Sequence, residues 1–342
     1  MWNFSQSVVG FLVYGVTALV LAAAFAIYLV SYSLSAPGPL NNDPMQGSAF
    51  FQVERGQGLS KIANNLHKEG LINDPFVFEV GARIKGVAGK LQAGEYQFEY
   101  GLSSEDIMNK MSVGTIYRRA VTIPEGLTVY QIYRRLNDVD ELKGELQYVS
   151  NNQEGMFLPD TYMYQLGETK ESVSLRMNKA MKDTLAELWP DREQGLPIKT
   201  VKQWVTLASI VEKETAVASE RKRVAGVFIN RLRKGMPLQT DPTVIYAITQ
   251  GKHKNDGRGP LGRRLLSRDL KYDSPYNTYV SAGLPPGPIA NPGRASLEAV
   301  LHPEKHNYIF FVADGQGGHV FSETLGEHNR NVAKWRKIRA GQ

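Results

Sequence analysis

The chain has 342 residues, of which 42% are hydrophobic and 22% charged, so wholesale disorder is excluded and about two domains are expected. The formal net charge of +6 is compatible with an anionic polymer or a membrane surface as partner, but it is too small to indicate nucleic acid. Cysteine is absent from the sequence. This excludes a disulfide framework, a Cys-ligated zinc or iron–sulfur site and a thiol nucleophile.

The first feature along the chain is an almost wholly apolar run from Val8 to Val30, and the first charged residue is Asp43. As a helix this run would be about 34 Å long, enough to cross a hydrocarbon core of about 30 Å. We therefore predict a short cytoplasmic tail at 1–7 and a single transmembrane helix at 8–32, in preference to a buried core helix. A signal peptide is the other alternative, because Ala24-Phe25-Ala26 resembles a cleavage site, but no basic region precedes the run.

A Pro- and Asn-rich linker at 33–47 is expected to lead into a small α+β module at 48–118. Residues 53–63 indicate a strand, a turn and a helix, with Leu59, Ile62 and Leu66 at helical spacing. Residues 91–98 indicate a turn and a second strand. This strand–helix–helix–strand order resembles the LysM module, a peptidoglycan-binding fold; a structural spacer is the alternative. Residues 122–136 repeat the first half of the plan.

The remainder, 119–342, is predicted to be a larger, mainly helical α+β domain. Helical periodicity is present at 172–188 and 199–217, and a third helix at 220–234 is closed by Gly235. Beyond residue 250 the chain is rich in Gly, Pro and Asn, with short strands expected near 308–313 and 319–321. Such loop-built surface is where functional sites tend to lie.

The helix at 199–217 carries two candidate acid–base residues. With Trp204 as reference, Leu207, Ala208 and Val211 form a buried stripe, and Glu212 and Glu214 lie on its opposite shoulders. Burial at the edge of an apolar stripe raises the pKa of a carboxyl toward the range of a general acid. Two solvated helix glutamates are the plainer interpretation.

The turn before the next expected helix contains Gln239, Thr240 and Asp241, followed by Pro242. Asp241 is interpreted as a helix N-cap with Pro242 at the first helical position, and a second catalytic carboxylate is the alternative. Gln239 and Thr240 line this turn and are placed to hydrogen-bond a sugar.

Polar aromatic residues beside a stiff Pro/Gly loop suggest the wall of a saccharide groove, although an ordered surface loop has the same composition. The groove candidates are Tyr276, Asn277, Tyr279, Leu284, Pro285 and Pro286. A metal site is not expected: His302 and His306 are four residues apart, but Pro303 stands where the zincin pattern has glutamate.

These motifs together resemble the YceG-like family, membrane-anchored endolytic murein transglycosylases, over about residues 48–335. The similarity is carried by the segments 154–162, 208–215, 227–232, 238–243, 276–279, 283–289, 291–293 and 327–329. So many motifs in the same order make a chance match very improbable.

The resemblance implies an enzyme that cuts the β-1,4 bond between N-acetylmuramic acid and N-acetylglucosamine within nascent peptidoglycan strands. It places the catalytic carboxyl at Glu214, acting as general acid and then as base, with no metal or other cofactor. It adds Tyr246 to the expected substrate contacts, which otherwise are the turn and groove residues named above. The expected location is the periplasmic side of the bacterial inner membrane, and peptidoglycan synthases are the expected protein partners.

Two other functions remain open at this point. A lysozyme-type hydrolase would use Asp241 to position a water, and its products would carry reducing ends rather than 1,6-anhydro ends. A peptidoglycan-binding scaffold without catalysis would depend on the LysM-like module alone.

Overall fold

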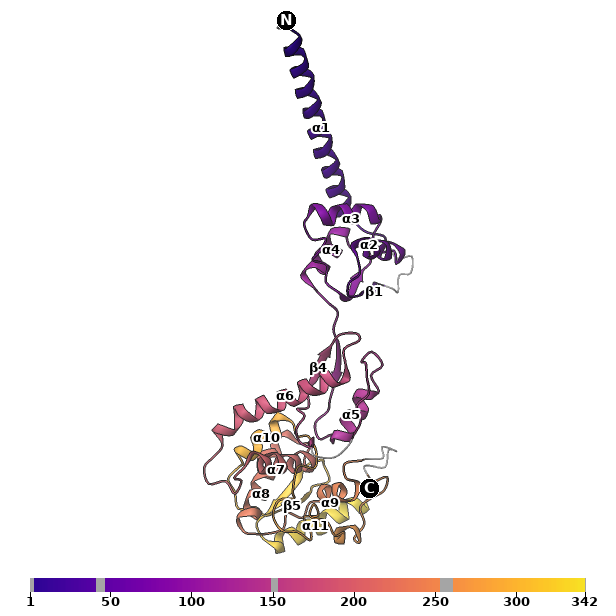
Figure 1. Ribbon diagram of the computed structural model, residues 1–342. Helices are drawn as coiled ribbons and strands as arrows, with labels where there is room; N and C mark the ends of the chain where they lie inside the picture. Colours follow the sequence, from indigo (N-terminus) through magenta and orange to yellow (C-terminus); the bar gives the residue numbers. More distant parts are fainter. Residues whose placement is uncertain (1–2, 41–46, 149–152, 253–260, 342) are drawn as a thin grey trace. The chain divides into compact units, whose positions relative to one another are not determined.

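The computed structural model describes residues 3–40, 47–148, 153–252 and 261–341 (Figure 1). Residues 1–2 of the expected tail and 41–46 of the expected linker lie outside this part. The chain divides into two compact units, Met1–Arg119 and Ala120–Gln342. Both units mix helices with short strands, and in the described residues each sheet has two strands, paired as β1–β2, β3–β4 and β5–β6.

Helix α1 (Asn3–Ser35) contains a stretch, Gly10–Ser35, that is long and apolar enough to cross a membrane. The helix continues past residue 32, where we expected it to end. Leu34 is only 1% exposed and lies in the core of the first unit, against Gly81, where a Cβ atom would overlap the leucine side chain. The expected linker at 33–47 is therefore wrong for residues 33–35, which are helical because Leu34 has a packing site in the folded unit.

The rest of the first unit contains the expected order of strand, helix, helix and strand. Strand β1 (Ser48–Val53) pairs antiparallel with β2 (Gly94–Glu99), and helices α2 (Leu59–Lys68), α3 (Pro75–Ile84) and α4 (Ser104–Val113) complete the unit. Asp74 caps α3 by accepting a hydrogen bond from the Phe76 N–H at 2.7 Å. The core consists of apolar side chains from all these elements, among them Ile62, Leu66, Phe78, Tyr96, Phe98, Ile107, Met108 and Met111.

The second unit begins within β3 (Arg119–Thr122), at Ala120, and this strand pairs with β4 (Thr161–Tyr164). Helix α5 (Val129–Asn137) follows β3 and starts with a capping box between Thr128 and Gln131. Ile132 and Leu136 are buried, as the repeated strand–helix pattern predicts.

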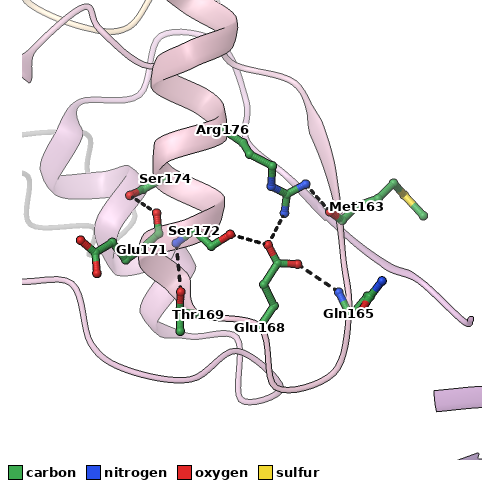
Figure 2. A network of polar contacts seen from close by, with 8 residues as sticks. All are labelled: Met163, Gln165, Glu168, Thr169, Glu171, Ser172, Ser174 and Arg176. Carbon is green, nitrogen blue, oxygen red and sulfur yellow. Dashed lines mark hydrogen bonds and ion pairs between the residues drawn. The ribbon is translucent and has the colours of Figure 1, made fainter. Parts of the chain in front are cut away.

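A network of polar side chains fastens β4 to helix α6 (Lys170–Leu188), as Figure 2 shows. Glu168 accepts hydrogen bonds from the Ser172 hydroxyl at 2.7 Å and from Arg176 at 2.9 Å. Arg176 also donates to the Met163 carbonyl at 2.7 Å. The start of α6 is therefore held against the end of the strand by charge-assisted bonds.

Helix α7 (Val201–Glu214) is the centre of the second unit. All residues from Trp204 to Val211 are buried, so the expected apolar stripe is in fact a helix buried on every side. The reason is that α8 (Arg221–Arg233), α9 (Asp241–Thr249) and α10 (Arg294–Leu301) all pack on it. It ends at Glu214 rather than at 217, because Thr215 has extended backbone, φ −138° and ψ 129°.

The remaining elements are short except for the last helix. Strands β5 (Phe310–Ala313) and β6 (His319–Ser322) pair antiparallel close to where strands were expected, and α11 (Leu325–Ala340) packs on them. Three 3₁₀ turns, η2 (Trp189–Asp191), η3 (Ala218–Glu220) and η4 (Asp269–Lys271), join larger elements. Gly235 follows α8 with φ +66°, the left-handed conformation predicted for its C-terminal position.

The central position of α7 generates a stability prediction. Trp204 is fully buried and its indole N–H donates to the Leu297 carbonyl at 2.8 Å, joining α7 to α10. Trp204→Phe removes this hydrogen bond and leaves space in the core, so the free energy of unfolding should fall by about 1–3 kcal/mol. Guanidinium unfolding of the detergent-solubilised chain measures this loss. Trp335→Phe, on the partly exposed face of α11, is the matched control and should change it by less than about 0.5 kcal/mol.

Candidate active site

Glu214, the last residue of α7, is half-buried, and its pKa is raised to about 7. Desolvation is the main cause, and the negative charge of Asp241 acts in the same direction. The Thr240 hydroxyl and the Arg231 guanidinium oppose them by favouring the ionised form. No ion pair holds this carboxyl among the residues that the structure describes. A carboxyl in this state can give up a proton and take one back near neutral pH.

The opposite shoulder of α7 is different, although the helical pattern by itself left the two glutamates equivalent. Glu212 accepts a hydrogen bond from the Gly293 N–H at 3.0 Å and lies 3.9 Å from Arg221. Between them in sequence, Lys213 donates to the Gly126 carbonyl at 3.1 Å. Glu212 is thus occupied in holding a neighbouring loop, while Glu214 faces the turn that precedes α9.

That turn is held by buried threonines. The Gln239 and Thr240 N–H groups donate to the carbonyl and hydroxyl oxygens of Thr278, both at 3.1 Å. Gln239 has φ +49°, an uncommon left-handed conformation for a residue with a side chain, and such conformations concentrate at functional sites. The Thr240 hydroxyl is buried and has no partner of full hydrogen-bond geometry in the described residues, so it is free to act on Glu214.

Asp241 is not the N-cap that we expected. Thr240 occupies the N-cap position, and Asp241 is the first residue of α9, with Pro242 next to it. The Asp241 carboxylate accepts a hydrogen bond from the Tyr279 hydroxyl at 2.7 Å and remains exposed. Together with burial, this contact raises the pKa of Tyr279. Its position next to Glu214 is compatible with an electrostatic role in the site.

Arg231 is a residue of this site that sequence reasoning missed. It lies on α8, is buried, and donates to the carbonyls of Ile309 and Leu238 at 2.7 and 2.5 Å. It therefore ties the turn before α9 to the approach to β5, while its charge favours the Glu214 carboxylate. The available signal was an arginine in the mostly apolar stretch 227–232, because charged residues are rarely buried without partners.

Four of the expected substrate contacts are buried, namely Thr240, Tyr246, Asn277 and Pro285, and two of them are bonded to groups of the fold. Asn277 donates to the Leu270 and Tyr272 carbonyls at 3.0 and 2.8 Å and accepts from the Tyr279 N–H. Tyr246 directs its hydroxyl to Glu154 at 3.3 Å. Both side chains bond inside the fold, so the expected contact of either with substrate stays a prediction. The short amide side chain of Asn277 thus pairs with the backbone carbonyl and N–H groups of its own loop.

The groove residues divide between two places. Tyr276 packs on Tyr246, with ring centroids 5.0 Å apart, and lines a cavity of about 460 Å³ together with Pro286. Tyr279 lies on the Glu214 side through its bond to Asp241. In the expected Pro/Gly wall, Pro285 is buried and Leu284 packs on the core, so of the three expected wall residues only Pro286 lines this cavity.

Glu154 is the second residue that sequence reasoning did not assign. It lines the same cavity, is buried, and accepts hydrogen bonds from the Val129 N–H at 2.9 Å and the Asn291 amide at 3.0 Å. Desolvation raises its pKa to about 8. Asn291 in turn accepts from the Phe157 N–H and donates to the Leu127 carbonyl. Glu154 therefore stands, protonated at neutral pH, where three chain segments meet.

This burial predicts a pH dependence of stability. The ordinary pKa of 4.5 applies to Glu154 in the unfolded chain and about 8 in the folded one, so only the folded state keeps the proton between these values. The free energy of unfolding should therefore fall as pH rises from 5 to 8, with up to about 1.4 kcal/mol per pH unit from this group.

Glu154→Gln removes the titrating proton and should make that slope shallower. The comparison is chemical unfolding at several pH values, with the exposed Glu145→Gln as matched control. Equal slopes in Glu154→Gln and wild type would contradict a raised pKa at this position.

The N-terminal helix long and apolar enough to cross a membrane, the two mixed units and the isolated carboxyl of raised pKa beside an aromatic loop define a protein with a site suited to acid–base chemistry. The chain belongs to the YceG-like family, whose sequence model matches residues 51–334. It is 33% identical to the endolytic murein transglycosylase of Bacillus subtilis (strain 168), with 89% of each chain covered.

Other similar proteins agree with this assignment. The endolytic murein transglycosylase of Streptococcus pneumoniae serotype 2 is 29% identical over 82% of this chain, which spans 57% of that longer protein. A crystal structure of a YceG-like protein from Listeria monocytogenes is 31% identical, covers 83% of this chain and 98% of its own, and superposes with a TM-score of 0.53. The similarity therefore extends over most of both units.

Proposed function

We propose that this protein is a membrane-anchored endolytic peptidoglycan transglycosylase that uses Glu214 as its acid–base group. The names of its relatives support the activity. The single observation that supports the residue is the half-buried Glu214 carboxyl with a pKa of about 7 and no ion pair in the described chain. The bond cut is the β-1,4 linkage from N-acetylmuramic acid to N-acetylglucosamine inside a nascent strand, which ends its elongation.

The proposed reaction has two proton transfers. Protonated Glu214 donates to the glycosidic oxygen as the bond from that oxygen to C1 of the muramic acid breaks. The carboxylate then removes the proton from the C6 hydroxyl of the same sugar, and that oxygen closes on C1 to give a 1,6-anhydro end. No water is consumed, so one carboxyl serves where most glycosidases use two. Holding the C6 hydroxyl in place supplies much of the rate.

The surrounding residues have distinct proposed tasks. Thr240 and Arg231 stabilise the carboxylate after it has given up its proton, and Asp241 keeps the resting acid protonated. Gln239, Thr240, Asp241, Tyr279, Tyr276 and Pro286 are the proposed sugar contacts, while Leu284 and Pro285 support the loop. Asn277 and Tyr246 act as positioning residues.

The first unit has a proposed role in binding. Its β1–α2–α3–β2 order supports a LysM-like module at 48–118 that holds peptidoglycan near the catalytic domain at 119–342, which we take to be lysozyme-like. Helix α1 is the proposed single-pass anchor in the bacterial inner membrane, with both units in the periplasm. Peptidoglycan synthases are the proposed protein partners.

Replacing Glu214 tests the reaction directly. Glu214→Gln keeps the size of the side chain but cannot donate a proton, so cleavage of uncrosslinked glycan strands should fall by about 10²–10⁴-fold. Glu212→Gln, two residues away on the same helix, should stay within a few-fold of wild type because its carboxyl holds a loop. Mass spectrometry of the released fragments gives both the rate and the chemistry of the new ends.

The products also separate the alternatives. Anhydro ends, about 18 Da lighter than hydrated ends, are expected from wild type. Reducing ends would instead favour hydrolysis with Asp241 positioning a water, an alternative suggested by its exposed carboxylate beside Glu214. Wild-type cleavage by Glu214→Gln would refute the assignment of the acid, and no cleavage by wild type would favour a binding scaffold.

The pH profile tests the electrostatics of the site. The reaction starts from protonated Glu214, so kcat/KM should fall above pH 7 as the carboxyl ionises. Asp241→Asn removes a negative charge that raises the pKa of Glu214, so the alkaline limb should move to lower pH. Asp140→Asn, exposed on the loop after α5, should leave the limb unchanged. An unmoved limb in Asp241→Asn would contradict the proposed electrostatic role.

A further inference from the structure

Helix α3 has an apolar face that no part of the described first unit covers. Phe76 and Ile84 are 70% and 47% exposed, and the half-buried Val80 lies between them at spacings of four residues, so the three share one side of the helix. Phe78 and Ala82 face the core of the unit. Val80 is two positions from each, or about 200° around the helix, so the apolar face points away from that core.

The position of α3 relative to α1 shows what this face meets. The middle of α3 touches the end of α1, because Leu34 packs on Gly81. Figure 1 shows α3 at the end of the first unit from which α1 leaves. The apolar face of α3, which is opposite the core, therefore faces the side of the unit from which the rest of α1 extends.

The level of the membrane boundary on α1 can be read from its aromatic residues. Tyr28 and Tyr32 are exposed and stacked, with ring centroids 6.4 Å apart, on the turns that precede Leu34. Tyr14 is exposed 18 residues before Tyr32, about 27 Å along the helix and close to the thickness of a hydrocarbon core. Tyrosine is enriched at both membrane interfaces. One interface then lies at Tyr28–Tyr32, within two helical turns of Leu34, which packs on α3.

We infer that α3 is a membrane-surface helix, whose Phe76, Val80 and Ile84 side chains enter the lipid interface beside α1. This inference rests on the proposed anchoring of α1. Arg83, next to Ile84, lies at the edge of the apolar face, where it pairs with Glu79 at 3.2 Å and where a basic side chain can also reach lipid headgroups. The occupant of this surface is thus the bilayer that α1 crosses, and the first unit lies on the membrane rather than above it.

The absence of cysteine from the sequence makes a direct test available. Single cysteines replace Phe76, Ile84, Leu21 or Val113 in the full chain, each is labelled with bimane, and the protein is reconstituted into vesicles of phosphatidylethanolamine and phosphatidylglycerol. Leu21 reports α1, and Val113 is a control that is 77% exposed at the end of α4. Lipids brominated in the acyl chains quench only fluorophores that contact them. We expect loss of fluorescence at 21, 76 and 84, and none at 113.

The outcomes separate the two hypotheses. Quenching at 21 with 76 and 84 behaving like 113 would overturn the surface helix and leave the anchor intact. No quenching at 21 would overturn the anchor and this inference with it, whereas the cleavage assay with Glu214→Gln reports on catalysis independently.

A charge in the middle of the apolar face gives a second measurement. Val80→Glu, made in the chain labelled at position 84, should weaken the quenching there, because a carboxylate at this depth is costly to desolvate. Gln52→Glu, exposed on β1, adds the same charge elsewhere and should not. Equal quenching in the two variants would contradict the inference.

Discussion

The candidate site depends on one constraint, the burial of a carboxyl at the end of a helix that is itself buried on all sides. Helix α7 carries Glu214 to the edge of the core and ends there, so the acid sits between the interior and solvent. Desolvation disfavours its charge, and the negative end of the helix dipole acts in the same direction. The Thr240 hydroxyl and Arg231 then limit the effect, so the pKa stays near neutrality rather than far above it.

A second buried carboxyl shows how the same physics serves a different purpose. Glu154 is also desolvated, but it accepts hydrogen bonds from Val129, Tyr246 and Asn291, which come from three separate parts of the chain. A group with so many fixed donors organises its surroundings, whereas Glu214 has few and stays available. The number of committed partners, more than the pKa alone, separates a structural carboxyl from a reactive one in this protein.

The sequence predicted the periodic parts of the structure well. The apolar helix, the helix of Glu214, the strand–helix plan around Ile132 and the last hairpin all have strong local patterns. Periodicity alone could not separate Glu212 from Glu214, because both lie at the edge of one stripe and their difference comes from Gly293, a residue distant in sequence. Side chains that fold inward, such as Asn277 and Tyr246, look the same in sequence as side chains that face a ligand. Arg231 and Glu154 were missed since their roles depend on partners from other elements.

The packing of Leu34 against Gly81 has a mechanical consequence. Because the end of α1 is part of the core of the first unit, the helix and the unit would turn together about the membrane normal if α1 spans the bilayer as proposed. A neighbouring membrane protein that bound one side of α1 would therefore fix the rotational orientation of the first unit about the membrane normal. Contacts that α1 makes inside the bilayer would then set the orientation of the first unit on the aqueous side, with no change of conformation.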